Sequence, residues 1–587
     1  MEALFNDSSQ RGILQTINFT SSNVSSSNLL GHAANFANMN TLIGNGTVLK
    51  KPYDELMPRH YTDQLYLLVF GIMILFMDLG FGLIEAGSVR TKNTTHILIK
   101  NILDSLAAGI AYWLFGFALA FGKGNEFMGW TNWAMSGLDD NKIAFAFYQA
   151  MFASTATTIV AGAVSERCEF IAYLLYSFIL TGLIYPVVTH WGWDYAGWLY
   201  KGSMYEFDGQ LVKVGYEDFG GSGLVHLVGG TAALVATCFL GPRIGRFNKE
   251  TGKVNYFKGH SVALQTIGIF VLLFGFMALN AAAQHHISHP GDAATVSLAV
   301  FNTLVAASIG GFTALITHRI GIFGNTWNIH GVINGAFVAM VAICGGCNSM
   351  RIWGAAVVGL VAPFYMKVIE LLLIKLKIDD PVNAVGIHFG GGSWGAISVA
   401  FLKYDTGILL AWNKRSVVML GWQMAGVGAV IAWTGVLSVA LYGTLKLVGI
   451  FRVSEEVERK GLDISRHHQQ AYPHEAYGYG HLHIVTAGEN GKLSSIEQGY
   501  VNKVFVTYEG HDLHEAESRS IRTIHSVPSI VEMESLDTEV SDVKPGHKVK
   551  ALPPLTWKRR QSYKNEGKHQ GELIQLNPIG GDKTVSV

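Results

Sequence analysis

The sequence predicts an all-α polytopic membrane protein with eleven transmembrane helices. Of its 587 residues, 49% are hydrophobic and only 15% are charged, whereas charged residues make up about a quarter of soluble domains. Apolar runs near the roughly 20 residues that cross a bilayer follow one another from about residue 65 to 450. The 67 glycines against 13 prolines favour closely packed helices. We therefore expect a lipid bilayer around the protein. A net charge of zero gives no reason to expect a nucleic-acid partner.

The expected helices follow the apolar runs in order. Their approximate boundaries are 64–86, 100–122, 143–164, 170–190, 222–241, 260–282, 294–316, 328–346, 352–374, 384–403 and 417–449. An odd number of spans places the two ends of the chain on opposite sides of the membrane. The most basic loop, residues 243–258, falls on the predicted inner side, as the positive-inside rule requires.

The chain divides into three expected regions. Residues 1–62 are a polar extracellular leader rich in Ser and Asn. This leader contains glycosylation sequons at Asn6, Asn18, Asn23 and Asn45. Residues 63–450 form the eleven-helix membrane domain. Residues 451–587, rich in charge, Ser and His, form a cytoplasmic regulatory tail whose distal part we expect to be disordered.

Two segments in the two halves of the chain share a pattern. Asp218 precedes His226 by eight residues, Asp380 precedes His388 by the same spacing, and glycines follow both histidines. These histidines fall in the fifth and tenth expected spans. Because five is odd, the second set of five helices inserts upside down relative to the first, and such inverted repeats build their sites where they meet. We expect the two histidines to face each other across a pseudo-two-fold axis.

Ionisable groups inside a span are costly, which makes them functional candidates. One buried histidine is explained equally well by a hydrogen bond between helices. Two at equivalent positions of a repeat favour a pathway instead. Neutral imidazoles offer both a donor and an acceptor, which suits a small hydrogen-bonding solute or a proton relay.

Six motifs carry a family resemblance. They are Asp78 to Arg90, Lys92-Asn93-Thr94, Ser165-Glu166-Arg167, Tyr185 to Trp193, Asp218 to Gly230 and Asp379 to His388. In this order they resemble the signatures of the ammonium transporter (Amt/Mep/Rh) family, and the likeness is greatest to plant-type ammonium transporters. The similarity extends from about residue 62 to 475, roughly seventy per cent of the chain.

The resemblance implies a fold and a set of site residues. The fold is the eleven-helix ammonium transporter fold with a five-plus-five inverted repeat, assembled as a homotrimer with one pore in each subunit. Trp193 and Asp218 match the outer recruitment site, where a cation gains about 0.5–2 kcal/mol over an aromatic face. Phe152 matches the first gate phenylalanine, and His226 and His388 match the twin-histidine pore. Lipid packing is the alternative interpretation of either aromatic residue alone.

The sequence departs from the family pattern at three pore positions. Leu279 stands where the family often has a second gate phenylalanine, so this gate lacks a π face. Ala283 stands where a serine often supplies a hydroxyl acceptor. Phe389 follows the second pore histidine where glycine is common, which narrows or reshapes the inner pore. We expect weaker recruitment of the charged ion, or an altered selectivity.

Within the tail, the segment Gly461 to His467 resembles the regulatory stretch of plant-type members, which couples neighbouring subunits and is switched off by phosphorylation. Ser465 aligns with the modified threonine. A phosphate there adds about −1.5 to −2 charge, enough to undock a tail that packs against cytoplasmic loops. The resemblance therefore implies a kinase as a partner, whereas an ordinary solvated serine is the alternative.

Two weaker features receive a structural interpretation. Cys344-Gly-Gly-Cys347 is interpreted as small-residue packing, since no second pair accompanies it. His285, His286 and His289 are interpreted as a solvated polar turn rather than a metal site. No Walker loop, GxSxG elbow or HExxH motif occurs in the sequence, so we expect neither an enzyme nor a cofactor or metal.

The expected function is that of a plasma-membrane ammonium transporter or channel, with its N-terminus outside and its C-terminus in the cytoplasm. Its expected substrate is ammonium or ammonia, with methylammonium as an analogue. Two alternatives stay open. One is an ammonium sensor that conducts little and signals through the long tail, and the other is a channel for neutral ammonia or carbon dioxide.

Overall fold

The computed structural model describes residues 47–248, 250–472, 484–487 and 493–496. Helix α3 (Thr47–Ser88) begins inside the segment that the sequence analysis assigned to the polar leader. The four sequons, at Asn6, Asn18, Asn23 and Asn45, lie outside the described residues, as does most of the tail. The description below therefore concerns the helical bundle and the first part of the tail.

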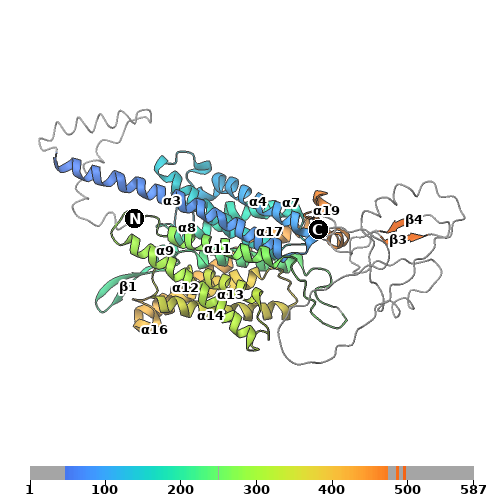
Figure 1. The fold of residues 1–587 in the computed structure, drawn as a ribbon. Coiled ribbons are helices and arrows are strands. Elements are labelled where there is room, and N and C mark those ends of the chain that lie inside the picture. The colour runs from blue at the N-terminus through green and yellow to red at the C-terminus, as the bar shows by residue number, and fades with distance from the viewer. Residues whose placement is uncertain (1–46, 249, 473–483, 488–492, 497–587) are drawn as a thin grey trace, which may run out of the picture. The chain divides into compact units, whose positions relative to one another are not determined.

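Apolar helices of different lengths make up the bundle (Figure 1). They are α3, α4 (Thr94–Ala111), α5 (Phe117–Phe121), α6 (Ile143–Ala163), α7 (Phe170–Ile179), α8 (Tyr185–Trp193), α10 (Val228–Leu240), α11 (Val262–Ala282), α12 (Asp292–Arg319), α13 (Ile329–Ile343), α14 (Ile352–Lys375), α15 (Gly391–Leu402) and α17 (Lys414–Leu447). Within the described residues, ten helical stretches are long and apolar enough to cross a membrane, and α13 is a shorter apolar helix at 15 residues. These eleven elements coincide with the eleven expected spans, so the prediction of an all-α polytopic fold is confirmed.

Four of the spans contain a π-helical turn. Tyr112–Gly116 joins α4 to α5, and Leu180–Ile184 joins α7 to α8. Ser222–Leu227 precedes α10, and Val385–Gly390 precedes α15. Such turns occur frequently at functional sites because they locally re-aim side chains within a helix. The last two contain the two histidines of the repeated pattern.

Glycines allow the helices to approach closely, as the composition suggested. A Cβ atom added at Gly268 of α11 would lie 2.7 Å from a side-chain carbon of Ile84 on α3. One added at Gly310 of α12 would lie 2.4 Å from the carbonyl oxygen of Gly335 on α13. Both distances are shorter than a carbon atom tolerates. Small residues at these contacts are the usual means by which helices associate in a bilayer.

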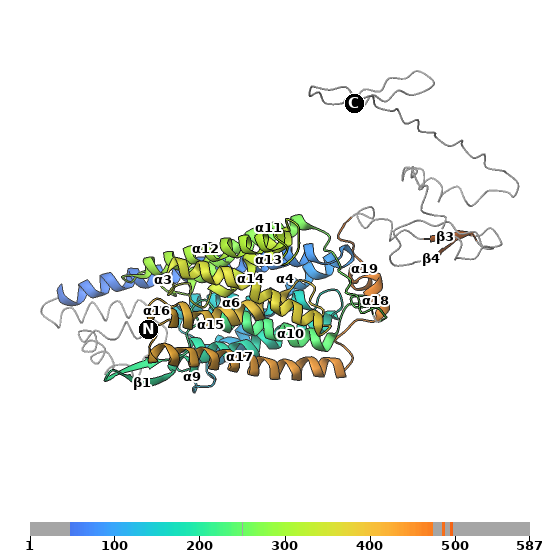
Figure 2. The same cartoon turned by 90° about the horizontal axis from the view of Figure 1, so that it is seen from below.

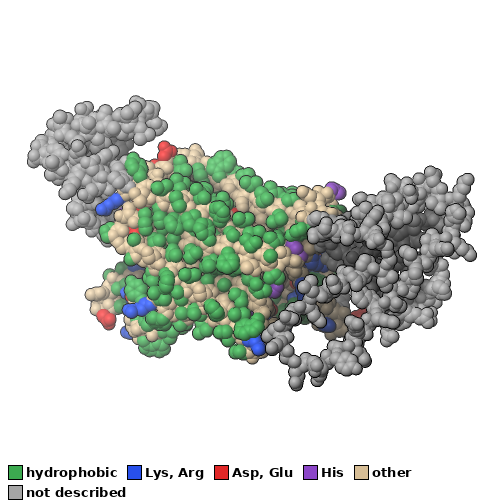
Figure 3. Space-filling view, in the orientation of Figure 1, with side chains coloured by type: hydrophobic (Ala, Val, Ile, Leu, Met, Phe, Trp, Pro, Cys, Tyr) green, Lys and Arg blue, Asp and Glu red, His purple; other side chains and the backbone are tan. Residues whose placement is uncertain are grey.

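The flank of the bundle is apolar. Large hydrophobic side chains such as Ile102, Phe270 and Val368 remain more than 60% exposed. Figure 3 shows hydrophobic side chains over the visible flank, and the charged side chains on that face lie near the two ends of the bundle. An exposed apolar band between polar ends matches a hydrocarbon layer. The protein is a multi-pass membrane protein.

Short elements distinguish the two ends of the bundle (Figures 1 and 2). One end carries α9 (Trp198–Lys201), α16 (Ile408–Ala411) and the antiparallel strands β1 (Ser203–Phe207) and β2 (Gln210–Val214), and we call it the vestibule end. The opposite end carries α18 (Glu455–Lys460) and α19 (Leu462–His467), and we call it the tail end. A separate hairpin pairs β3 (Ile484–Ala487) with β4 (Leu493–Ile496).

Candidate functional site

An aspartate caps each of the two helices that carry the histidines. Asp218 Oδ2 accepts hydrogen bonds from the backbone N–H groups of Gly223 (2.9 Å) and Leu224 (2.7 Å). Asp380 does the same at the second helix, from two N–H groups at 3.1 and 2.7 Å. Burial raises the pKa of each carboxyl to about 6, against the lowering effect of these hydrogen bonds. In both halves of the chain, the aspartate of the repeated pattern thus caps the start of the π-helical turn that contains the histidine.

The two histidines lie side by side in the interior of the bundle. Their ring centroids are 5.3 Å apart with an interplanar angle of 27°, and the two Nδ1 atoms are 3.3 Å apart. His226 is 0% exposed and His388 is 1% exposed. A Cβ atom added at Gly230 would lie 2.2 Å from the backbone nitrogen of Phe389, so the helices that carry the histidines touch at this glycine. The structure therefore brings together two residues that are 162 positions apart in the sequence.

Aromatic rings and one thiol surround the histidine pair. The Phe276 ring stacks on His226 with the centroids 5.3 Å apart. The Phe337 ring meets His388 edge-on, with a centroid distance of 5.1 Å. Cys344 Sγ lies 3.8 Å from His226 Nε2. The pair therefore lies in an apolar lining, and no charged side chain is among these described contacts.

Sequence reasoning missed this lining. Phe276 and Phe337 lie on helices that are apolar all round, so periodicity could not assign them to the interior. Cys344 was interpreted only as part of a packing motif, and its thiol is free and buried. The packing interpretation describes Cys347 better, since its side chain is fully buried within the hydrophobic core. The spacing of the two cysteines contained no signal for a contact with His226.

The predicted gate residue adjoins the predicted recruitment residue Trp193. Phe152 is fully buried, and its ring meets Trp193 edge-on with the centroids 5.4 Å apart. Tyr148 packs on the other side of Phe152 at 4.8 Å. The Trp193 indole N–H donates to the backbone oxygen of Asp218 (2.7 Å), which fixes the indole beside the capped helix. The structure thus connects the predicted recruitment residues with the predicted gate.

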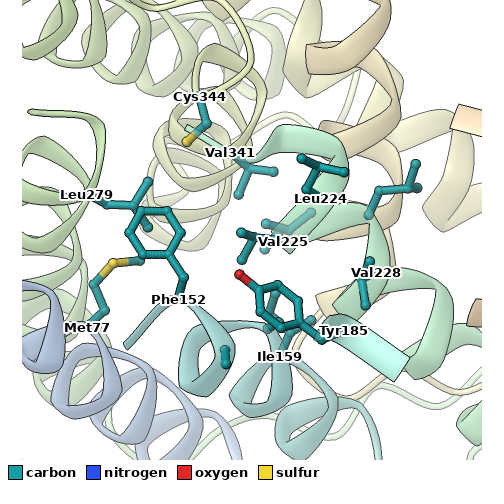
Figure 4. Close-up of a cluster of buried hydrophobic side chains, with 14 of the residues drawn as sticks. Met77, Phe152, Ile159, Tyr185, Leu224, Val225, Val228, Leu279, Val341 and Cys344 are labelled. Atoms are coloured by element: carbon teal, nitrogen blue, oxygen red, sulfur yellow. The ribbon is translucent and has the colours of Figure 1, made fainter. Parts of the chain in front are cut away.

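The two departures on α11 lie at its vestibule end. Leu279 is fully buried and belongs to the same cluster of hydrophobic side chains as Phe152 (Figure 4). Ala283, which follows the last residue of the helix, is 7% exposed. Its methyl group offers no hydrogen-bond acceptor. The gate therefore contains one phenylalanine and one leucine.

At the tail end, the family-like motifs form a buried ion-pair network. Glu166 Oε2 pairs with Arg90 (2.6 Å) and Arg243 (3.2 Å). Asp379 pairs with Arg243 (2.8 Å) and Arg246 (3.1 Å). Burial alone would raise the pKa of Glu166, but Arg243 and Arg90 lower it to about 2. Both acids are therefore charged and paired, and they connect four segments that lie far apart in the sequence.

The first part of the tail docks onto the same end. Asp463 accepts hydrogen bonds from the backbone N–H groups of Thr95 (3.1 Å) and His96 (2.8 Å) at the start of α4. Lys92 donates to backbone oxygens of α18, one of them at 3.0 Å. Arg466 pairs with Glu169 at 2.5 Å. Ser465 lies within this docked helix, and its Oγ is buried without a hydrogen-bond partner among the described residues.

A bundle of apolar spans that encloses a pair of histidines is the architecture of a polytopic membrane protein. The model of the ammonium transporter family matches residues 65–472, and the chain belongs to this family. The match covers the whole membrane domain and the docked part of the tail.

Known relatives agree with this assignment. The chain is 42% identical over 436 residues to the putative ammonium transporter 1 of Caenorhabditis elegans, which covers 71% of this chain and 80% of the relative. It is 35% identical over 410 residues to ammonium transporter 1 member 1 of Arabidopsis thaliana, which covers 66% and 80%. The resemblance to plant-type members is thus confirmed.

Solved structures show the same fold. A sensor Amt protein is 30% identical and superposes with a TM-score of 0.64, covering 70% of this chain and 99% of that one. Mep2 of Candida albicans is 24% identical with a TM-score of 0.59, covering 68% of this chain and 87% of that one. The second likeness concerns the fold alone.

Proposed function

We propose that this protein moves ammonium or ammonia across the plasma membrane through a pore lined by His226 and His388. The observation that carries the proposal is the buried imidazole pair, 3.3 Å apart at Nδ1, on the two capped helices of an inverted repeat. Neutral imidazoles in an apolar lining can form hydrogen bonds with a small solute. Because they carry no fixed charge, they do not hold the solute tightly. The proposed vestibule end faces outward, and the tail end faces the cytoplasm.

The proposed path has three steps. Ammonium binds between Trp193 and the backbone that Asp218 organises, where the aromatic face attracts the cation. It then passes Phe152 and gives up its proton near this gate, because the apolar region beyond it is costly for an ion. Ammonia and the released proton then both cross along His226 and His388 to the tail end, so that net positive charge moves inward. The same path admits methylammonium as an analogue.

Three further features belong to the proposal. Family membership supports a homotrimer in which each subunit has its own pore. Ser465 is proposed as a kinase site, since a phosphate of about −1.5 to −2 charge cannot stay in the small space around its Oγ while α19 remains docked. The sequons at Asn6, Asn18, Asn23 and Asn45 are proposed glycosylation sites on the outer side.

A second candidate function is an ammonium sensor with little conduction. Two observations favour it: the solved sensor Amt protein with 30% identity, and the replacement of family-typical pore residues by Leu279 and Ala283. In this case ammonium binding at the vestibule end would act on the docked tail. A channel for neutral ammonia or carbon dioxide is the remaining alternative.

The test measures current and uptake in a heterologous cell exposed to ammonium, with surface expression quantified for each variant. We expect saturable inward current in the wild type, lost in His226→Ala and reduced in Phe152→Ala. His318→Ala is the matched control, since that histidine lies near the end of α12 and its Nδ1 contacts the Ala314 carbonyl oxygen of the same helix at 2.8 Å. Uptake without current would indicate neutral ammonia. Neither signal, in protein that reaches the surface, would overturn the transport proposal in favour of the sensor.

A further inference from the structure

Three potential metal ligands converge in the loop between α11 and α12, at the vestibule end. His286 Nδ1 lies 2.7 Å from Asp292 Oδ2, and His289 Nδ1 lies 3.4 Å from the same oxygen. The ligand atoms of the three residues all lie within 4.8 Å of one another. The sequence analysis grouped His285 with the two other histidines. The fold instead brings in Asp292, the first residue of α12.

Hydrogen bonds around these residues hold them in place. The backbone N–H of His289 donates to Asp292 Oδ2 (2.8 Å), and Gln284 donates to Oδ1 (2.9 Å). Asp63 on α3 accepts from two successive backbone N–H groups of the loop, at 2.8 and 3.0 Å, and from the Ser288 hydroxyl at 2.8 Å. Outer hydrogen bonds of this kind orient the ligands of metal sites and improve their affinity.

The arrangement leaves one ligand atom unused. A hydrogen-bonded polar turn accounts for His286, whose ring meets the carboxylate at 2.7 Å. It accounts less well for His289, whose buried Nδ1 lies 3.4 Å from Asp292 Oδ2 but makes no hydrogen bond within the described residues. The side chains of His286 and His289 are 37% and 28% exposed, so an ion can enter from the solvent. A metal ion could be coordinated by His289 Nδ1.

We propose that His286, His289 and Asp292 bind a zinc ion. Two imidazoles and one carboxylate are ligands that zinc prefers, with a fourth, open position for water. Calcium and magnesium favour all-oxygen sites, so this donor set selects against them. Zinc bonds of about 2.0–2.2 Å place tetrahedral donors roughly 3.4 Å apart. The two imidazole nitrogens lie 2.7 and 3.4 Å from the carboxylate oxygen, and no pair of ligand atoms is more than 4.8 Å apart.

The site adjoins the proposed entrance. His285 lies in the same loop with a φ of 65°. Its ring centroid lies 5.5 Å from that of Tyr148, which packs on the proposed gate residue Phe152. A bound divalent cation would therefore add positive charge beside the entrance and repel ammonium. We infer that external zinc lowers ammonium entry several-fold, a consequence that rests on the proposed function.

The first test measures zinc binding directly, by titration calorimetry on the purified full chain with a tag that contains no histidine. The wild type is compared with His289→Ala, whose side chain is partly exposed. It is also compared with Asp63→Asn, which weakens the three outer hydrogen bonds that Asp63 accepts from the loop. Compared with the wild type, we expect His289→Ala to bind one zinc ion fewer per chain, or to bind that ion at least about tenfold more weakly. In Asp63→Asn we expect a smaller loss of zinc affinity. His60→Ala is the matched control, because this histidine bonds Asn141 outside the cluster.

Equal zinc affinity in the wild type and His289→Ala would overturn the zinc site, and so would tighter binding of calcium than of zinc. The second test adds zinc to the outside of cells that take up ammonium. We expect zinc to inhibit ammonium uptake by the wild type and to leave uptake by His289→Ala unchanged. If zinc binds at this site but ammonium uptake by the wild type does not change, the inference that zinc inhibits entry is overturned. Zinc bound by a protein that moves no ammonium would leave the site standing and refute the transport proposal alone.

Discussion

The histidine pair and the tail-end network are both polar clusters inside the bundle, yet their surroundings are opposite. His226 and His388 contact each other, aromatic rings and a thiol. Glu166 and Asp379, in contrast, are held by several arginines at 2.6–3.2 Å. In the histidine pair, the polar ring atoms contact no charged side chain within the described part of the chain. In the tail-end network, each buried carboxylate is paired with arginines.

This contrast separates two roles. A buried charge is tolerated only when partners of opposite charge compensate it. The carboxylates and arginines of the tail-end network therefore depend on one another for the stability of the fold. A neutral imidazole tolerates an apolar lining and keeps hydrogen-bonding capacity for a passing solute. The two clusters therefore predict different consequences of substitution: loss of stability at the tail end, and loss of conduction at the histidine pair.

The largest expected effect follows from breaking the network. In Glu166→Ala, Arg90 and Arg243 lose a buried partner, and the free energy of unfolding is expected to fall by about 3–5 kcal/mol. Thermal unfolding in detergent measures this loss. Lys201→Ala is the matched control, since it removes an ion pair with Glu126 in which both side chains are exposed. Such a pair contributes less than about 1 kcal/mol to stability. Equal losses in the two variants would contradict the structural role of the network.

The pH dependence of wild-type stability sharpens the same prediction. The native pKa of Glu166, about 2, is lower than its ordinary value near 4.5 because of Arg243 and Arg90. A carboxyl with a depressed native pKa contributes stability above the unfolded pKa, and this contribution is lost as the pH falls through the window from 4.5 to 2. We expect the slope of unfolding temperature against pH in this window to be smaller in Glu166→Ala than in the wild type.

The same contrast explains how much the sequence could predict. The eleven spans follow from the apolar runs, because bilayer thickness fixes the length of a spanning helix. The closeness of His226 and His388 was predicted from their equivalent spans, since an inverted repeat places equivalent residues around one axis. The hydrogen bonds that Asp218 and Asp380 accept at the start of the two histidine turns were not predicted from the sequence.

Other features required coordinates. On a helix that is apolar all round, the sequence does not indicate which face lies inward, so Phe276 and Phe337 could not be assigned to the histidine pair. Asp292 joins two histidines because a loop turns back onto the start of α12, and the spacing alone does not predict that turn. The π-helical turns likewise were not predicted from the sequence.

A smaller effect is expected where the tail meets the bundle. Asp463 caps the start of α4 from another segment, so Asp463→Ala removes two hydrogen bonds without leaving a buried charge. Loss of a cap costs about 1 kcal/mol, which corresponds to roughly fivefold faster hydrogen exchange in residues 94–97 and 462–467. Glu455→Ala is the control, because its pair with Arg459 is exposed. Unchanged exchange in Asp463→Ala would show that this cap does not hold the tail.

The smallest expected effect is a gain at the gate. Leu279→Phe restores a second aromatic face within the cluster that contains Phe152, and a cation near such a face gains about 0.5–1 kcal/mol. We therefore expect ammonium to bind about two- to fivefold more tightly, measured as a lower half-saturating concentration in uptake. Leu279→Met is the control, since it adds length without a π face. Because the histidine pair is untouched, the maximal rate should stay the same. An unchanged half-saturating concentration in Leu279→Phe would place ion recognition entirely on Trp193 and Phe152.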